Sequence, residues 1–264
     1  MNEMPLKDTT FYTLREGFSP LQEEARSIPR YKPYLLVKRI FDILFSFLVI
    51  LLVFPWLLPI LLIAIRINSR GPSFFKQKRI GLGGRQFVCI KLRTMYVNNF
   101  ADTKQAVKND PRITGFGKFL RTTGLDELPQ FFNILRGNMS LVGPRPHMLV
   151  EHEEFAAIIP GYVLRNGLKP GITGLAQVRG YRGVASNFAS ISKRFQLDMH
   201  YVRHIDLLMD LRIMISTVRL MIKAMFSGNK LVSADQSALQ DHPAPAEEIQ
   251  INYRPKNSYS KINY

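Results

Sequence analysis

The chain is poor in cysteine and in acidic residues. The first shortage limits the disulfides and the compartment that are possible, and the second limits the charge of the partners that it can bind. Cys89 is the only cysteine among 264 residues, so no internal disulfide can form and a reducing compartment is expected. Asp and Glu total 20 against 36 Lys and Arg, which gives a formal net charge of +16. Such an excess of positive charge favours anionic partners, namely nucleic acid, anionic lipid or phosphorylated compounds.

Several common functional motifs are also missing. No Walker lysine motif is present, so an ordinary P-loop ATPase is disfavoured. The glycines at 81–84 do not complete a dinucleotide-binding fingerprint. No serine nucleophile elbow and no nucleic-acid-binding signature occur. His200 and His204 share a helix face, but no third ligand is evident nearby, which disfavours a metal site there.

One long apolar run, Ile43–Ile65, stands out from the basic background. About 20 apolar residues suffice to cross a bilayer, and the run begins too far into the chain for a removable signal peptide, so we expect a permanent anchor. Pro55 and Pro59 interrupt it, and basic residues flank it at Lys38 and Arg66. Two topologies stay open: a single-pass helix with a proline kink, and a re-entrant segment with both ends in the cytoplasm.

Composition divides the chain into four regions. Residues 1–34 are polar and proline-rich and are expected to form a loosely ordered extension. Residues 35–67 form the membrane segment, and residues 68–226 form one domain of ordinary size. Residues 227–264 are polar again, and we expect a disordered tail.

Local patterns predict the elements of the domain. Two strands flank a Gly-rich turn and predict a β-hairpin, at 74–80 and 85–93. Apolar residues at helical spacing predict helices at 113–121, 126–136, 147–159, 186–203 and 205–226. The last of these carries five charges, so an interfacial or core helix is favoured over a membrane span. Loops or extended segments are expected at 98–112, 140–146 and 168–174.

The sharpest candidate site is the acidic pair Asp126 and Glu127. Pro129 is expected in the first turn of a helix, where its missing N–H costs nothing, and this places both carboxylates at a helix N-terminus. The helix dipole stabilises anions there. A purely structural interpretation stays open, because Asp is a favoured N-cap and Glu is common in a first turn.

Basic residues near the acidic pair favour a catalytic role over a helix-capping role for its carboxylates. Arg121 precedes the pair by about one turn, Lys91 and Arg93 end a predicted strand, and Arg145 lies in a rigid proline-rich segment. Each can bind a phosphate, although Arg145 can also be an exposed residue of an ordinary turn. Paired acids with several fixed cations suit phosphoryl transfer with a divalent ion.

Six collinear motifs then define a resemblance. They lie at Lys38–Asp42, Gly71–Gln77, Lys91–Met95, Leu125–Gln130, Asn138–Pro146 and Lys169–Val178. Over about residues 35–226 the chain resembles the bacterial sugar transferases, the monotopic polyprenyl-phosphate phosphoglycosyl transferases, in their short catalytic-core form. The resemblance implies a mainly helical α+β fold: a re-entrant helix–break–helix at Pro55 and a cytoplasmic catalytic domain with a small β-hairpin and interfacial amphipathic helices. It places the protein on the cytoplasmic face of a bacterial inner membrane.

The resemblance also implies a reaction. A UDP-sugar gives its sugar 1-phosphate to undecaprenyl phosphate and releases UMP, which initiates assembly of an exopolysaccharide, capsule, O-antigen or glycoprotein glycan. Asp126 would form an aspartyl-phosphosugar intermediate, Glu127 would assist it, and both would bind Mg²⁺. The phosphate-binding positions fall on Lys91, Arg93, Arg121 and Arg145, and Asp198 would support nucleotide or cation binding.

Partners follow from the same resemblance and from the charge. Besides the two substrates, we expect anionic membrane lipids as partners and no nucleic acid, and a homodimer stays open. A non-catalytic membrane adaptor that recruits partners through its basic surface is the alternative function. It predicts no UMP release, and the intact acidic pair with its arginines speaks against it.

Overall fold

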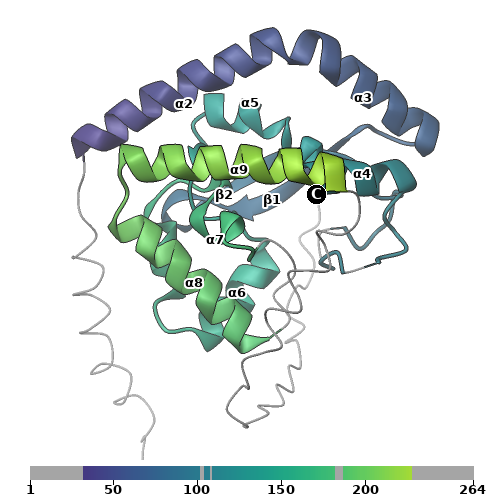
Figure 1. Cartoon of the computed structure of the whole chain (residues 1–264). Helices are drawn as coiled ribbons and strands as arrows, with labels where there is room; N and C mark the ends of the chain where they lie inside the picture. Colours follow the sequence, from purple (N-terminus) through teal and green to yellow (C-terminus); the bar gives the residue numbers. More distant parts are fainter. Residues whose placement is uncertain (1–31, 102–103, 108, 182–186, 228–264) are drawn as a thin grey trace, which may run out of the picture.

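The computed structural model describes residues 32–101, 104–107, 109–181 and 187–227. The described chain is mainly helical with two small sheets, which agrees with the expected α+β class (Figure 1). Nearly all of the predicted extension and tail lies outside the described residues. The elements are α2 (Lys32–Leu52), α3 (Phe54–Asn68), β1 (Phe74–Ile80), η1 (Leu82–Gly84), β2 (Gln86–Leu92), α4 (Gly115–Thr123), η2 (Leu125–Glu127), α5 (Gln130–Leu135), β3 (Ser140–Val142), α6 (Leu149–Ile158), η3 (Tyr162–Gly167), β4 (Gly171–Thr173), α7 (Leu175–Val178), α8 (Phe188–Arg203) and α9 (Leu207–Ser227).

Helices α2 and α3 form a bent pair that arches over the rest of the chain (Figure 1). The two helices are bent by 66°, and the break lies at Val53, two residues before the predicted break at Pro55. Pro55 lies in the first turn of α3, where a missing N–H costs nothing, whereas Pro59 lies inside the helix without ending it. In the described ranges no single helix is long and apolar enough to span a membrane, but this bent pair passes the same test jointly.

Helix α5 packs in the angle of the bent pair. The Phe54 ring meets the rings of Phe131 and Phe132 edge-on, with centroids 6.4 and 5.4 Å apart. Arg39 in α2 donates hydrogen bonds to the carbonyl oxygens of Ile134 and Leu135 at the end of α5. The opposite sides of both helices expose large apolar residues, among them Leu36, Leu44, Ile60 and Ile63. A continuous exposed apolar surface of this kind marks a contact with a membrane or another protein.

A second set of contacts fixes α2 to the domain through buried polar groups. The Lys38 ammonium pairs with the Asp210 carboxylate, which also accepts hydrogen bonds of 2.7 Å from the hydroxyls of Tyr34 and Tyr201. Asp42 accepts a hydrogen bond of 3.0 Å from the backbone N–H of the middle residue of β3. We call these five residues the anchor cluster. It joins α2 to α8, α9 and β3.

The predicted β-hairpin is confirmed. Strands β1 and β2 pair antiparallel in a register that sets Phe74 opposite Leu92 and Ile80 opposite Gln86. The turn between them contains Gly83 with φ +63°. This left-handed conformation suits glycine, which explains the Gly-rich connection.

The predicted loop at 168–174 is in part a strand. Strand β4 pairs in parallel with β3, with Ser140 opposite Gly171 and Val142 opposite Thr173. The two backbones approach closely, since a Cβ on Gly143 would lie 2.4 Å from the carbonyl oxygen of Lys169. Glycine is therefore required where the segment carrying Arg145 leaves β3.

The helix predicted at 126–136 is wrong in its continuity. The 3₁₀ turn η2 covers Leu125–Glu127, and a separate six-residue helix, α5, follows Pro129. The helices predicted at 113–121, 147–159 and 186–203 are confirmed within about two residues as α4, α6 and α8. Helix α9 buries Asp210 and Ile213 on one side and exposes Leu208 and Val218 on another, as expected for an amphipathic helix.

Candidate active site

The acidic pair lies in the turn between α4 and α5, directly beneath α3. Gly124 ends α4 with φ +77° and opens η2, so the chain reverses there and carries Asp126 and Glu127 inward. The flanking Leu125 and Leu128 pack on an apolar cluster formed by α3, α4 and β2. Both carboxylate residues are buried, at 9% and 7% exposure. Packing of Leu125 and Leu128 on α3 therefore fixes the position of the acidic pair relative to the bent helix pair.

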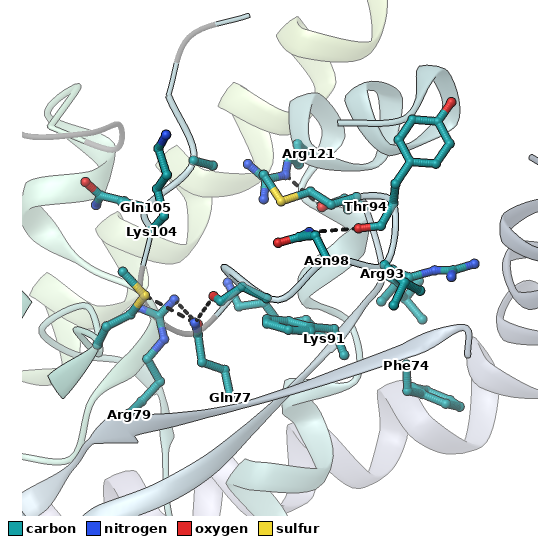
Figure 2. A pocket seen from close by; sticks show the side chains of 18 of the residues that line it. Phe74, Gln77, Arg79, Lys91, Arg93, Thr94, Asn98, Lys104, Gln105 and Arg121 are labelled. Atoms are coloured by element: carbon teal, nitrogen blue, oxygen red, sulfur yellow. Dashed lines mark hydrogen bonds between the residues drawn. The ribbon is translucent and has the colours of Figure 1, made fainter. Parts of the chain in front are cut away.

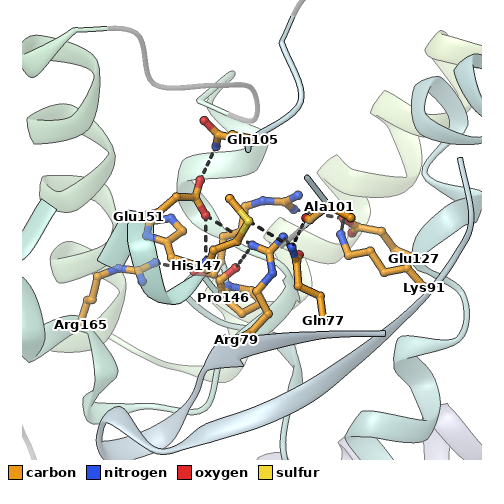
Figure 3. Close-up of polar contacts among 12 residues, drawn as sticks. Gln77, Arg79, Lys91, Ala101, Gln105, Glu127, Pro146, His147, Glu151 and Arg165 are labelled. Atoms are coloured by element: carbon orange, nitrogen blue, oxygen red, sulfur yellow. Dashed lines mark hydrogen bonds and ion pairs between the residues drawn. The ribbon is translucent and has the colours of Figure 1, made fainter. Parts of the chain in front are cut away.

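The two carboxylates of the pair have different partners. One oxygen of Glu127 receives Lys91 at 3.0 Å and Arg145 at 3.2 Å (Figure 3 shows the first of these pairs). Among the described residues no side chain forms an ion pair or hydrogen bond with the Asp126 carboxylate. Burial raises the pKa of Asp126, and the neighbouring Glu127 charge adds to this, whereas Lys91 and two arginines oppose it. Lys91 and Arg145 thus hold the Glu127 carboxylate in place, while no described side chain binds the oxygens of Asp126.

A cavity of about 340 Å³ opens between the β-hairpin, α4 and the start of α6. Asp126 and Glu127 do not line it, but Lys91 and Arg145, which pair with Glu127, do. Seven of its lining residues are cations, and Glu151 is the single carboxylate among them. Figure 2 labels five of these cations, Arg79, Lys91, Arg93, Lys104 and Arg121. The cations are Arg79, Lys91, Arg93, Lys104, Arg121, Arg145 and Arg194. Such an excess of fixed positive charge, partly buried, favours an anionic ligand with several charges.

Three of the predicted phosphate-binding residues meet at this cavity. Lys91 comes from β2, Arg145 from the segment after β3, and Arg121 from α4, where its Nε donates to the Thr94 hydroxyl at 2.8 Å. Burial lowers the pKa of Arg121, and the Asp126 charge counters this effect. The predicted cations thus converge from three elements that are distant in sequence.

Arg93 is placed differently. Its guanidinium donates two hydrogen bonds of 2.6 Å to the carbonyl oxygens of Ser69 and Arg70, at the end of α3. It lines the cavity, but these bonds tie the end of β2 to the bent helix pair. Phosphate binding by Arg93 stays a prediction, and the geometry gives this side chain a positioning role.

Asp198 lies behind the site and acts through a residue that the sequence did not indicate. Its carboxylate accepts hydrogen bonds of 3.0 and 2.7 Å from Arg165, and both side chains are 2% exposed. Arg165 also donates a hydrogen bond of 2.7 Å to the backbone carbonyl of Arg145. Burial raises the pKa of Asp198, and the Arg165 charge opposes this. Asp198 and Arg165 therefore position Arg145, which in turn holds Glu127.

A second polar network forms the opposite wall of the cavity. The Glu151 carboxylate accepts hydrogen bonds from the Gln105 side chain and the N–H of Met148, and Arg79 lies 3.5 Å away (Figure 3). Gln77 donates to the carbonyl of Ala101 at 2.8 Å. The network fixes the described part of the segment 98–112, which was expected as a loop, against the hairpin.

The histidines on this side are buried, not superficial. His147 and His152 are 2% and 9% exposed, so both pack inside the fold. The Tyr162 hydroxyl hydrogen-bonds to His147 Nδ1. Burial and the surrounding arginines lower the pKa of His147 well below its usual value, which keeps the ring neutral.

The carboxylates of the site fit a divalent ion that enters bound to the phosphates of a substrate. The described residues contain no group of three or more His, Cys, Asp or Glu that could hold a metal alone. Mg²⁺ commonly binds through one or two carboxylates together with waters and substrate phosphates. Asp126 and Glu127 supply two adjacent carboxylates beside a cavity suited to phosphates, so the residues present fit Mg²⁺.

Comparison with known proteins places the chain in a family. A family model described as bacterial sugar transferase matches residues 33–224. The chain belongs to this family.

Relatives share its sequence over most of the described part. A UDP-glucose:undecaprenyl-phosphate glucose-1-phosphate transferase of Klebsiella pneumoniae is 46% identical over 69% of this chain and 39% of its own length. A protein of the same name from Caulobacter vibrioides is 44% identical over 80% of this chain and 75% of its own. A UDP-N-acetylgalactosamine-undecaprenyl-phosphate N-acetylgalactosaminephosphotransferase of Aeromonas hydrophila is 38% identical over 70% and 44%. The chain thus spans about 40% of the length of several of its relatives.

Proposed function

We propose that this chain transfers a sugar 1-phosphate from a UDP-sugar to undecaprenyl phosphate and releases UMP. The names of the relatives supply both substrates, and the seven cations of the cavity support a donor with a diphosphate. One observation carries the proposal: Glu127 is fixed by Lys91 and Arg145, while Asp126 beside it has no described partner. The product would initiate assembly of a surface polysaccharide or another glycan.

In the first step a carboxylate oxygen of Asp126 attacks the phosphorus nearer the sugar. The new O–P bond forms while the bond from this phosphorus to the bridging oxygen breaks, and UMP leaves with the electron pair. Asp126 must be ionised to react, and no described side chain binds its oxygens, which supports their availability for attack. A covalent intermediate divides one difficult displacement into two easier ones.

In the second step a phosphate oxygen of the lipid attacks the same phosphorus. The bond to Asp126 breaks and returns the electron pair to the carboxylate, so the enzyme is restored without net proton transfer. The product is a polyprenyl diphosphate that carries the sugar. One phosphorus position serves both steps, so one set of cations can stabilise both transition states.

The cations supply most of the catalytic field. Lys91, Arg121 and Arg145 face the cavity from fixed elements and neutralise charge that builds on the transferred phosphoryl group. Glu127 orients Lys91 and Arg145 toward this position. Mg²⁺, held by Asp126 and Glu127 when a substrate brings it, would add further neutralisation of phosphate charge.

We further infer that α2 and α3 form a re-entrant segment on the cytoplasmic face of a bacterial inner membrane. The 66° bend, the exposed apolar outer sides and the basic residues at both flanks support this topology. The bend would hold Asp126 near the lipid headgroups. A single cysteine within residues 1–34 tests it, because buried Cys89 will not react. We expect no labelling from the periplasm of intact cells, and efficient labelling would contradict the topology.

UMP release across a panel of UDP-sugars tests the activity. The panel includes UDP-glucose and UDP-N-acetylgalactosamine, the donors in the names of the relatives. Asp126→Asn should abolish transfer to lipid and leave membrane association intact. Asp206→Asn, a change of the same kind at an acid near the start of α9, is the matched control and should keep its activity. Full activity of Asp126→Asn would contradict the assignment of the nucleophile.

A further inference from the structure

The lining of the cavity is chemically divided. Lys91, Arg121 and Arg145 gather on the side of the acidic pair. Another part of the lining is apolar and open to the outside, and contains Phe74, Tyr96 and Val97 at 37%, 53% and 67% exposure. We call Phe74, Tyr96 and Val97 the apolar rim. Exposed apolar side chains at the edge of a charged cavity offer contact area to a ligand that has an apolar part.

The apolar rim adjoins the end of the bent helix pair. Helix α3 ends at Asn68, and a Cβ on Gly71 would lie 2.8 Å from Val97 Cγ2 and 2.3 Å from the Arg93 guanidinium. Val97 and Arg93 therefore pack directly on the backbone that leaves α3, and Arg93 bonds to the two preceding carbonyls. Helix α3 itself exposes Ile67 in its last turn. Apolar surface is thus present from the end of α3 to the mouth of the cavity.

Only one of the two proposed substrates has this division. A UDP-sugar is polar along its whole length, with hydroxyls at both ends of its diphosphate. A polyprenyl phosphate joins one anionic group to a purely apolar chain. If the phosphate of this lipid lies at the cations of the cavity, the first isoprene units must pass along the cavity lining before the chain reaches the membrane. Apolar area favours such a chain by roughly 25 cal/mol per Å² that it covers.

We propose that the apolar rim binds the isoprene units next to the phosphate of the lipid acceptor and leads them from the side of α3 to the cations. The proposal rests on the proposed function, because it takes its acceptor from there. It assigns the rim to the second step of the reaction and not to the first.

The two steps can be measured separately. Exchange of labelled UMP into the UDP-sugar, without lipid, reports the first step, and the KM for undecaprenyl phosphate reports the second. The full chain is compared with Val97→Asn, Val97→Leu and the matched control Val163→Asn. Val163 in η3 is 54% exposed and does not line the cavity. Because Val97 is 67% exposed, its replacement should leave the fold intact.

We expect Val97→Asn to raise the KM for the lipid about tenfold, since it loses most of the benefit of burying one valine. UMP exchange should stay within about twofold of the unchanged chain. Val97→Leu keeps an apolar side chain and should raise the lipid KM much less than Val97→Asn does. Val163→Asn should match the unchanged chain in both assays. A tenfold fall of UMP exchange in Val97→Asn would overturn the proposal, because the rim would then bind the nucleotide-sugar. An unchanged lipid KM would overturn it as well. Failure of the proposed function looks different, because the unchanged chain would then show neither exchange nor transfer.

Discussion

Two buried clusters of charged side chains, the candidate active site and the anchor cluster, differ in how their charges are matched. Seven cations and one carboxylate line the cavity, so positive charge stays in excess there. In the anchor cluster Asp210 binds Lys38 and the hydroxyls of Tyr34 and Tyr201, and Asp42 accepts a backbone N–H. None of these five side chains lines the cavity. Excess positive charge around a cavity indicates an anionic ligand. Buried polar groups that bond to one another inside the fold, as Lys38 and Asp210 do, indicate a structural role.

The largest effect is expected from breaking the anchor cluster. Asp210→Ala leaves the Lys38 ammonium buried without its partner, which should cost about 3–5 kcal/mol in the free energy of unfolding. Activity per folded molecule should change little, because the cluster does not touch the cavity. Denaturant unfolding in detergent, with activity measured on the folded fraction, checks both.

A double variant sharpens this test. Lys38→Met with Asp210→Leu removes both charges and should recover much of the lost stability. A stable but inactive Asp210→Ala protein would contradict the contrast, because the anchor cluster would then take part in the chemistry.

The next largest effect is expected at the active site. Arg145→Ala removes a cation that pairs with Glu127 and that would, under the proposed function, bind the transferred phosphoryl group, so kcat/KM should fall roughly 10²–10³-fold. The melting temperature should change little, because Lys91 stays paired with Glu127. Arg85→Ala, at an exposed arginine of the hairpin turn, is the control. If Arg145→Ala lost much stability but kept its activity, Arg145 would be a structural residue and not an active-site residue.

A smaller effect on kcat/KM is expected at Asp198 and Arg165, which are buried like the anchor cluster but lie next to the active site. Asp198 and Arg165 are buried and matched, yet Arg165 holds the backbone of Arg145. Asp198→Asn should lower kcat/KM about tenfold through a loosened Arg145. The pair Asp198→Leu with Arg165→Met separates the two roles: stability should return toward normal while activity stays low. Recovery of both would show that the pair serves the fold alone.

The smallest effect concerns pH. Burial raises the pKa of Asp126 in the folded state, so the folded state binds its proton more readily than the unfolded state. This contribution to stability is complete below the unfolded pKa and is lost as pH rises through the folded pKa. Asp126→Asn should therefore be slightly more stable than the unchanged chain at neutral pH, and the difference should shrink as pH falls. Melting curves between pH 4 and about pH 8 check this, and a difference that grows toward low pH would contradict it.

Local signals in the sequence predicted the local structure well. The Gly-rich turn fixed the hairpin because Gly83 adopts a left-handed conformation that other residues avoid. Pro129 correctly marked a helix start, but the helix begins after it, because Gly124 and the 3₁₀ turn interrupt the chain first. Motif order led to the family, and the predicted Asp126, Glu127, Lys91 and Arg145 lie together.

Features that depend on distant partners were not readable in the same way. Strand β4 has three residues and exists only because β3 lies beside it, 31 positions away in the register. Arg165 is 33 positions from Asp198, and nothing in its own neighbourhood signals the pairing. Arg93 looked like a phosphate ligand, but its guanidinium bonds to the end of α3, a contact that only the folded chain reveals.

The assignment of Asp126 as nucleophile is tested most directly by trapping the intermediate. The full chain is mixed with a UDP-sugar without lipid, quenched in acid and analysed by peptide mass spectrometry. We expect a sugar-phosphate adduct on the peptide that contains Asp126, and its loss after lipid is added before the quench. An adduct on another residue, or lipid product formed with no adduct at any time, would contradict the account.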